Sequence, residues 1–597
     1  MAAPTPAAPS DRDLASIAEA RALARLAKAA QSLLAEFSQQ QIDAIVDAMA
    51  KAAESQVGPL AQLAVEETGF GVVADKVQKN LFSARQVYEF IRPMKTVGVV
   101  NRIEDRKVIE IAEPFGVVAA IVPSTNPTST AIYKILIAIK ARCAIVISPH
   151  PSAARCITRV AEIMSEAARA AGAPDGAIGW MTTVTLEGTQ ELMKQREVAV
   201  ILATGGMGLV RAAYSAGKPA YGVGPGNAPC YIESSADLAK AAWDILTGKC
   251  FDNGVLCSSP NSVVVDEAVA EETRRQFQAR GGYFLKPAEA DALAKVLVSP
   301  QRLPNPALVG KPATLIAEKA GFTVPAGTCA LIAELTGVGR DFPLSIEKLC
   351  PVLSFYVVRD WREGCERCKE ILRYGGMGHT MSIHSKNDAV ILEFGLHKPA
   401  FRICVNTPTT HGSIGLTTGL DPAMTLGCGG FGGNITSDNI SPKHLLNIKR
   451  LAYEIRPAVP AATLSAAREA GATAPAPSAS SAPASDRRLP QAPPAPAPGG
   501  IGGDQLIRRV DQFLKSRGFA GAAASGSMGT VPATSVTGTV PSLPPDAPAE
   551  FVCEDDVRQA MRANRRISVT ERTIITPAAR DLGESHGVFA TPGVTRQ

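Results

Sequence analysis

The sequence has no segment that would cross a membrane and no basic stripe that would bind nucleic acid. Its most apolar stretch, YKILIAIKARCAIVI, is interrupted by Lys134, Lys140 and Arg142, so no uncharged run approaches a membrane span. The N-terminus has no basic start followed by an apolar block, which argues against a secretory signal. The formal net charge of +5 is small for 597 residues and is not clustered. These absences predict a cytoplasmic protein without membrane or nucleic-acid partners.

Cysteine is also sparse. Twelve cysteines in 597 residues are ordinary for a cytosolic protein with reduced thiols. Cys365 and Cys368 form a single C-x-x-C pair, and no second pair lies at zinc-binding spacing. We therefore expect no metal site.

The composition changes sharply near residue 457. The Ala/Pro/Ser-rich segment 457–503 cannot bury enough apolar surface to offset its ordering entropy, so we interpret it as a linker. Residues 504–518 predict a helix with one apolar face. A second linker covers 519–549, and 550–590 predict a small module of helices and short strands. The tail is therefore expected to be mostly disordered around two short ordered segments.

Before this point the sequence alternates apolar and polar stretches as in a folded α/β protein. Residues 12–92 predict helices, and TVGVVNRIEDRKVIEIAEP predicts a hairpin, with alternating apolar positions on each side of IEDR. From residue 115 onward, short β-branched runs alternate with helical segments, which is typical of a parallel, doubly wound sheet. The runs NSVVVDE and LSFYVV indicate a second α/β unit after about residue 237.

Two places carry possible chemistry on residue type alone. Thr204, Gly205 and Gly206 end a buried strand, where glycines let a helix N-terminus approach a phosphate. A glycine after a strand is, however, more often a simple turn. Cys250 and Cys257 lie on either side of an Asn-Gly turn, and each could be a nucleophile or a small buried side chain. Position alone does not separate them.

Four motifs in a fixed order carry a family resemblance. They are IVPSTNPTSTAIYKILIAIKARCAIVISPHP, ILATGGMGLVRAAYSAGKPAYGVGPGN, FDNGVLCSS and TLGCGGFGGN followed by SPKHLLNIKR. Over roughly residues 12–455 they resemble the CoA-acylating aldehyde dehydrogenases, including one half of the bifunctional aldehyde/alcohol dehydrogenases and the acylating sulfoacetaldehyde dehydrogenases. The resemblance implies an α/β aldehyde dehydrogenase fold and a homodimer or homotetramer. Its parts would be a Rossmann-like NAD(P)-binding domain with N-terminal helices (1–97 and 113–236), an oligomerisation hairpin (98–112), an α/β catalytic domain (237–428) and a C-terminal arm (429–456).

The resemblance separates the two cysteines. Cys257 matches the nucleophile, whose thiolate would add to the aldehyde carbon, release hydride to the nicotinamide and keep the acyl group as a thioester. Asn126 matches the side-chain donor to the oxyanion, with the backbone N–H of Cys257 as second donor. Residue type alone would favour Asn126 as a turn residue before proline. Cys250 has no match, and we expect it to be a packing residue.

Cofactor contacts are also implied by the match. Glu347 corresponds to the glutamate that holds the nicotinamide ribose. Ser148 and His150 stand where hydrolytic relatives carry a lysine for the adenosine ribose. No Asp or Glu is placed to bind a 2′-hydroxyl and no Arg to bind a 2′-phosphate, so NAD and NADP both stay open. The residues expected to bind the cofactor are Ser148, His150, Thr204, Gly205, Gly206 and Glu347.

One expected residue is missing. Hydrolytic aldehyde dehydrogenases carry a glutamate base that activates water, and alignment of GVGPGNAP puts Val223 at that place. Valine cannot take a proton, and a thiol is far more acidic than water, so the acyl group is expected to leave to coenzyme A. His379 matches a histidine of the acylating group. It could deprotonate the CoA thiol, position substrate, or be a structural histidine in a Gly-rich turn.

The function implied is reversible oxidation of a small aldehyde, acetaldehyde or propionaldehyde, with NAD(P)+ and with coenzyme A as co-substrate. One alternative is an acylating sulfoacetaldehyde dehydrogenase, although no clear arginine pair would bind a sulfonate. A hydrolytic aldehyde dehydrogenase and an assembly scaffold are further alternatives. The tail is too short for an alcohol dehydrogenase unit, so we do not expect a bifunctional enzyme.

The tail carries a second resemblance. The 504–518 helix between Pro/Ala-rich linkers is similar to the encapsulation peptides of bacterial microcompartment cargo enzymes, which dock an apolar face onto shell proteins. The 550–590 module looks similar to a short module of other microcompartment-associated proteins. These resemblances imply a location inside a bacterial microcompartment and a shell-protein partner bound through 504–518. The alternative is an autonomous tail helix or one that docks within the chain.

Overall fold

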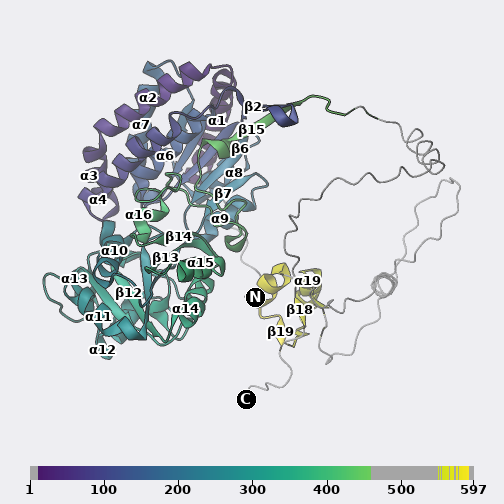
Figure 1. Ribbon diagram of the computed structural model, residues 1–597. Helices are drawn as coiled ribbons and strands as arrows, with labels where there is room; N and C mark the ends of the chain where they lie inside the picture. The colour runs from purple at the N-terminus through teal and green to yellow at the C-terminus, as the bar shows by residue number, and fades with distance from the viewer. Residues whose placement is uncertain are drawn as a thin grey trace, which may run out of the picture. The chain divides into compact units, whose positions relative to one another are not determined.

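The computed structural model describes residues 11–456, 458, 549, 551, 552, 554–563, 565–570, 573–575 and 577–590. The chain divides into two compact units, Met1–Thr473 and Ala474–Gln597 (Figure 1). The two predicted linkers and the predicted helix 504–518 lie outside the described residues.

A parallel five-stranded sheet lies at the centre of the first α/β part of unit 1. Its strand order is β5-β4-β3-β6-β7, with β3 in the middle. All six residues of β3 are buried, as expected for a parallel sheet covered on both faces. The strands are β3 Val117–Val122, β4 Ile145–Pro149, β5 Ile178–Trp180, β6 Val198–Thr204 and β7 Ala220–Val223.

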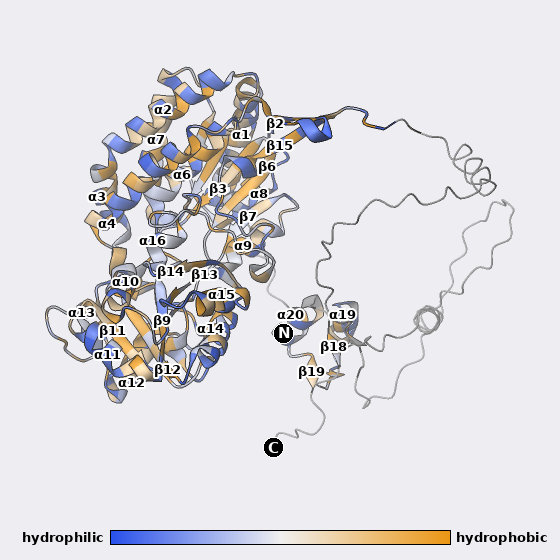
Figure 2. Cartoon of the chain, in the orientation of Figure 1, coloured by the Kyte–Doolittle hydropathy of each residue, from blue (hydrophilic) through white to orange (hydrophobic). Residues whose placement is uncertain are grey.

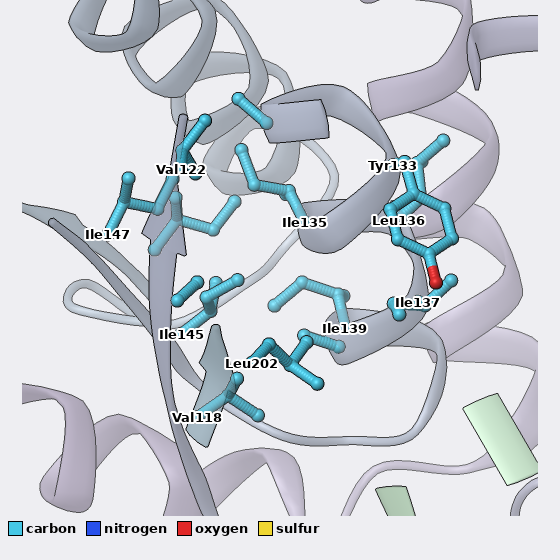
Figure 3. Close-up of a cluster of buried hydrophobic side chains, with 14 of the residues drawn as sticks. Val118, Val122, Tyr133, Ile135, Leu136, Ile137, Ile139, Ile145, Ile147 and Leu202 are labelled. Carbon is cyan, nitrogen blue, oxygen red and sulfur yellow. The ribbon is translucent and has the colours of Figure 1, made fainter. Parts of the chain in front are cut away.

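Helices surround this sheet. They are α1 Asp11–Leu34, α2 Gln39–Ser55, α3 Val57–Thr68, α4 Val73–Leu81, α5 Tyr88–Ile91, α6 Pro127–Lys140, α7 Ala154–Ala170, α8 Leu186–Lys194 and α9 Met207–Tyr214. Helix α6 is buried over its whole length. Figure 3 shows Ile135 and Ile139 of this helix among the core side chains of the neighbouring strands, including Val118, Ile145 and Leu202. This aliphatic core fixes the strand ends from which the site residues project.

A second parallel sheet, of seven strands, has the order β10-β11-β12-β9-β8-β13-β14. Its first strand along the chain is β8, Ala228–Ile232, which pairs with β9 and β13. The predicted domain boundary between 236 and 237 is therefore too late by one strand. A short buried apolar run carries no signal of which sheet it joins, because both sheets are parallel and fully covered. The remaining strands are β9 Pro260–Asp266, β10 Gly282–Phe284, β11 Ala330–Glu334, β12 Val352–Val358, β13 Gly378–His384 and β14 Ala400–Val405.

The helices of this second part are shorter on average. They are α10 Leu238–Cys250, α11 Glu267–Gln278, α12 Pro287–Leu297, α13 Ala313–Lys319, α14 Trp361–Tyr374, α15 Asp388–Leu396 and α16 Thr409–Ser413. Figure 2 shows hydrophobic strands inside the helices, whose hydrophilic residues are turned outward. None of the helices within the described residues is both long and apolar enough to span a bilayer.

The predicted hairpin is present. β1, Gly98–Ile103, and β2, Val108–Pro114, pair antiparallel across a tight turn. The sequence did not predict the third strand of this sheet, β15, Leu446–Ala452, which pairs with β2 along its whole length. The predicted hairpin and the predicted C-terminal arm thus form one small sheet.

Unit 2 contains a small α/β module with its own core. Two strand-helix-strand halves follow one another, and their strands pair in parallel, β16 with β18 and β17 with β19. The elements are β16 Phe551–Val552, α19 Glu554–Arg562, β17 Ile567–Ser568, β18 Ile574–Ile575, α20 Pro577–Ser585 and β19 Phe589–Ala590. The core includes Val552, Val557, Ala560, Ile567, Ala579 and Val588. The helices and short strands expected for 550–590 are therefore present.

Candidate active site

A cavity of about 470 Å³ lies beyond the carboxyl ends of strands β3, β4, β6 and β7. Strand order reverses between β3 and β6, and ligands of open α/β sheets bind at such switch points. Almost all predicted site residues meet at this cavity, and His379 is the exception. Those that line it are Asn126, Ser148, His150, Thr204, Gly205, Gly206, Val223, Cys257 and Glu347.

Cys257 lies between a 3-10 turn, Phe251–Gly254, and strand β9. Gly226 packs directly against its backbone, since a Cβ at Gly226 would come within 2.1 Å of the Cys257 carbonyl oxygen. Burial, and next the carboxyl group of Glu347, raise the pKa of the Cys257 thiol to about 12. The resting side chain is therefore a protonated thiol facing the cavity.

Asn126 stands at the start of helix α6 but does not cap it, because its side chain accepts no hydrogen bond from the first turn. Instead, its Oδ1 accepts a hydrogen bond of 2.7 Å from Lys79 Nζ. Its Nδ2 donates only a 3.3 Å bond to Thr125 Oγ1. The amide N–H₂ at the cavity wall is thus available for a ligand oxygen.

Glu347 precedes β12 and is bound to the backbone beside the nucleophile. Its Oε1 accepts a 2.8 Å hydrogen bond from the N–H of Gly226. Burial raises the pKa of Glu347 to about 8, against the lowering effect of the Gly226 bond. Of the described residues that line the cavity, Glu347 is the only carboxylic acid. It is therefore a candidate proton acceptor that acts electrostatically on Cys257, in addition to its predicted contact with a ribose.

Val223 ends strand β7 and lines the same cavity, with 3% of its surface exposed. The structure thus has an aliphatic group at the place where the sequence comparison expects the water-activating glutamate of hydrolytic enzymes. An apolar group there cannot polarise a water molecule.

The other end of the cavity has features that suit a nucleotide. The hydroxyl of Thr204, at the end of β6, is buried and has no partner among the described residues. Gly206 is the N-cap residue of helix α9, whose N-terminus is a favourable place for a phosphate. Ser148 Oγ lies 2.7 Å from Thr189 Oγ1. An unpaired hydroxyl and a helix N-terminus on one wall fit the phosphates and riboses of a dinucleotide.

His379 does not reach this cavity. It lies on β13 with 1% of its surface exposed, and its Nδ1 is 2.9 Å from the hydroxyl of Thr380. Burial, and secondly the charge of Arg402, lower the pKa of His379 to about 3. Its Nε2 has no partner in the described part of the chain. The ring is therefore neutral, and it lies next to Gly226 and the Cys257 backbone without lining the cavity.

The remaining cysteines of interest are packing residues. Cys250 ends helix α10, packs against a hydrophobic core and places its Sγ 3.4 Å from the carbonyl oxygen of Cys329. Cys365 and Cys368 are buried on α14 in another core. Among the described residues, no cluster of three or more His, Cys, Asp or Glu side chains could hold a metal ion.

Sequence reasoning missed an ionic cluster behind Asn126. Lys76 and Lys79 of α4 both contact Asp252 of the 3-10 turn, and all three side chains are at most 2% exposed. Burial lowers the pKa of Lys79 to about 7, against the raising effect of Asp252. Two lysines three apart on a helix are usually solvated. Only their contact with a carboxylate 176 and 173 residues away, respectively, distinguishes these two.

Comparison with known proteins agrees with this geometry. The profile of the aldehyde dehydrogenase family matches residues 10–283. The bifunctional aldehyde-alcohol dehydrogenase AdhE of Escherichia coli strain K12 is 44% identical over 441 residues, which are 73% of this chain. The chain spans only about half of that relative, 49% of its length.

Two solved structures are similar over nearly their whole lengths. The acetylating aldehyde dehydrogenase of Geobacillus thermoglucosidasius has 50% identity and a TM-score of 0.74, with 76% of this chain and 100% of that chain covered. A propionaldehyde dehydrogenase from the fucose utilisation bacterial microcompartment of Clostridium phytofermentans has 27% identity and a TM-score of 0.66, covering 72% of this chain and 96% of that one.

Proposed function

Because the chain belongs to the aldehyde dehydrogenase family, in its CoA-acylating branch, we propose that it converts a small aldehyde, CoA and NAD(P)+ into acyl-CoA and NAD(P)H. The observation that carries this proposal is the set of residues that line one cavity. Cys257 and Asn126 face it together, and Val223 stands where a hydrolytic enzyme would have its base. A covalent acyl group could form there without being passed to water.

The residues act in a definite order. Cys257 gives up its proton and its sulfur adds to the aldehyde carbon, which makes a tetrahedral oxyanion. The amide of Asn126 and the backbone N–H of Cys257 donate hydrogen bonds to that oxygen. The nicotinamide cofactor, when bound, supplies the acceptor for the hydride. The thioester left on Cys257 is then attacked by the CoA thiol, which restores the free cysteine.

Glu347 is the group that supports proton transfer in this scheme. It is the one carboxylic acid among the described cavity residues, and its carboxyl group acts electrostatically on Cys257. Burial raises the pKa of Glu347 to about 8, so the ionised form that can accept the thiol proton increases as pH rises through this value.

The decisive experiment is a coupled assay. Purified protein is mixed with an aldehyde and NAD+ or NADP+, with and without CoA, and both reduced cofactor and acyl-CoA are measured. Steady formation of reduced cofactor that requires CoA and is matched by acyl-CoA supports the proposal. Steady formation of free carboxylic acid without CoA would overturn it in favour of a hydrolytic enzyme. The same assay decides between NAD and NADP.

For the substrate we propose acetaldehyde or propionaldehyde. One of the relatives named above is a propionaldehyde dehydrogenase, and another is named as acetylating. Among the described residues that line the cavity there is no lysine or arginine, so nothing there would pair with the sulfonate of sulfoacetaldehyde. A panel containing all three aldehydes tests this, and a preference for sulfoacetaldehyde would contradict it.

We also propose that the tail directs the enzyme into a bacterial microcompartment through residues 504–518, which would bind a shell protein. The similarity to a microcompartment propionaldehyde dehydrogenase supports this location. Deleting 504–518 should leave specific activity unchanged and abolish co-purification with shells. A truncated enzyme that still co-purifies would contradict the role of this segment.

Association into a homodimer or homotetramer is the last part of the proposal. The three-stranded sheet exposes Val99 and Leu451, and the residues after its last strand expose Tyr453 and Ile455; these large apolar side chains suit an interface. Light scattering on a size-exclusion column measures the mass. A monomer at micromolar concentration would contradict it.

A further inference from the structure

The buried cluster behind Asn126 has a geometry that the proposed reaction would use. Lys79 Nζ contacts two groups at once, the carboxylate of Asp252 and the amide oxygen of Asn126, the latter at 2.7 Å. Neither Lys79 nor Asp252 lines the cavity, whereas Asn126 does. Lys79 therefore acts on the cavity only through Asn126.

The contact decides which end of the amide faces the cavity. A lysine ammonium only donates hydrogen bonds, so it must meet the oxygen of Asn126 and not the N–H₂ group. The opposite orientation would bring two donors together. Nδ2 then points away from Lys79, and among the described residues it donates one hydrogen bond, the weak 3.3 Å contact with Thr125 Oγ1. One amide N–H is left for an oxygen in the cavity.

The charge also strengthens that donor. A cation at the carbonyl oxygen draws electron density from the amide, which makes the N–H a better donor to an anion. Asp252 raises the pKa of Lys79 against the lowering effect of burial and so favours its charged form, and water does not screen the pair, because both side chains are at most 2% exposed.

Asp252 joins this arrangement to the nucleophile. It belongs to the turn Phe251–Gly254, which leads directly to Cys257, and it has a left-handed backbone with φ 51°. Its Oδ1 accepts a 2.7 Å bond from the N–H of Val72, and its own N–H donates a 2.7 Å bond to Asp75. The turn is thus held to the start of helix α4 by two hydrogen bonds. A single buried ion pair connects the oxyanion donor to the segment that carries the sulfur.

We propose that Lys79, held by Asp252, is a positioning residue that orients and polarises Asn126 as the oxyanion donor. This inference rests on the proposed function, since it assumes that a tetrahedral oxyanion forms on Cys257. Lys79 does not touch the substrate in this arrangement.

Lys76 provides a matched control. Its Nζ also binds Asp252, at 2.9 Å, and it is as buried as Lys79, but its other contact is the backbone carbonyl of Thr125 at 3.3 Å. Lys79→Met and Lys76→Met each remove one buried cation from the same carboxylate. They differ in whether the side chain of Asn126 loses its partner.

The test measures the single-turnover burst of NAD(P)H with aldehyde and cofactor but no CoA. Loss of one oxyanion donor costs on the order of 10²–10³ in rate, and a donor that is only misoriented should cost about 10–100-fold. We expect that loss for Lys79→Met, with KM for the aldehyde nearly unchanged, and less than about threefold for Lys76→Met. Equal losses in the two variants would overturn the proposal.

A double-mutant cycle separates positioning from general destabilisation. In an Asn126→Ala background, adding Lys79→Met should change the burst by less than about twofold, because the group it acts on is gone. Additive losses would mean that Lys79 acts by another route. Should Lys79→Met fail to fold, Lys79→Gln and Lys76→Gln are judged by the same two criteria.

Failure of the proposed function gives a different result. If wild-type protein shows no aldehyde-dependent burst, the reaction itself is wrong and the lysine variants are irrelevant. If the wild type shows the burst and the cycle is additive, only the role of Lys79 is wrong. Alkylation of Cys257 by iodoacetamide needs no oxyanion donor, so its rate should stay within about twofold in Lys79→Met.

Discussion

The two sides of the Cys257 backbone differ in kind. On one side lies the cavity, with Asn126 and Glu347 on its wall. Next to Gly226, and not among the residues that line the cavity, lies the neutral ring of His379, with 1% exposure. Sequence comparison marks groups in both places as functional, but Asn126 and Glu347 line the cavity and His379 does not. Position in a motif therefore does not by itself give access to the substrate.

The polar partners on the two sides also differ. The cavity side is supported by charge, through the Lys79–Asp252 pair behind Asn126. The His379 side is a hydrogen-bonded chain, in which Arg402 Nε donates to the Thr380 hydroxyl at 3.4 Å and that hydroxyl faces His379 Nδ1. The first arrangement suits stabilisation of a developing anion. The second holds a ring in place.

The largest expected effect comes from the nucleophile itself. Cys257→Ala should lower the aldehyde-dependent burst of NAD(P)H by at least about 10³-fold, because no covalent adduct can form. Cys250→Ala should keep most of the activity and lower the melting temperature, since its sulfur packs against a core. Mass spectrometry after incubation with acyl-CoA should show an acyl group on the wild type and not on Cys257→Ala. The reverse pattern would exchange the roles of the two cysteines.

A second prediction concerns Asn126. Two substitutions distinguish loss of its hydrogen-bond donor from introduction of a negative charge. Asn126→Ala should reduce the burst by about 10²–10³-fold. Asn126→Asp keeps an acceptor for Lys79 but turns a carboxylate oxygen toward the oxyanion, so it should be slower still. Its melting temperature should nevertheless be at least that of Asn126→Ala, because the new carboxylate pairs with the lysine. An aspartate variant as active as wild type would show that Asn126 donates nothing.

Substitution of His379 should have a smaller effect, and it tests whether this histidine takes part in the CoA step. A base for the CoA thiol would contribute about 10²–10⁴-fold to thiolysis alone. Because the ring lies outside the cavity and its pKa is lowered to about 3, we expect no such role. His379→Gln should slow the burst and the transfer to CoA by the same factor, about tenfold or less. Selective loss of the CoA step, measured by rapid quench, would restore the histidine as a base.

Much of this site followed from the sequence, and the rest depends on contacts between distant segments. The β-branched runs gave β3 and β6 correctly, and Thr204 and Gly205 lie at a strand end facing the cavity as predicted. Strand β8 was placed in the wrong sheet, because nothing local tells one parallel sheet from another. The pairing of Lys79 with Asp252 was missed, since a lysine in a helix carries no sign of a carboxylate 173 residues away.

The smallest expected effect concerns Glu347 and stability. Burial raises its pKa to about 8 from a model-compound value of 4.5. Between these values the folded protein holds a proton that the unfolded chain has lost, so stability falls as pH rises through this window. The Glu347→Gln side chain cannot lose a proton, so the stability of this variant should not fall with pH through this window. Differential scanning fluorimetry should show the melting temperature of the variant rising relative to wild type by about 2–4 °C between pH 5 and pH 8.5. A constant difference across this range would mean that Glu347 is ionised in the empty cavity, and that it already carries the charge needed to accept the proton of Cys257.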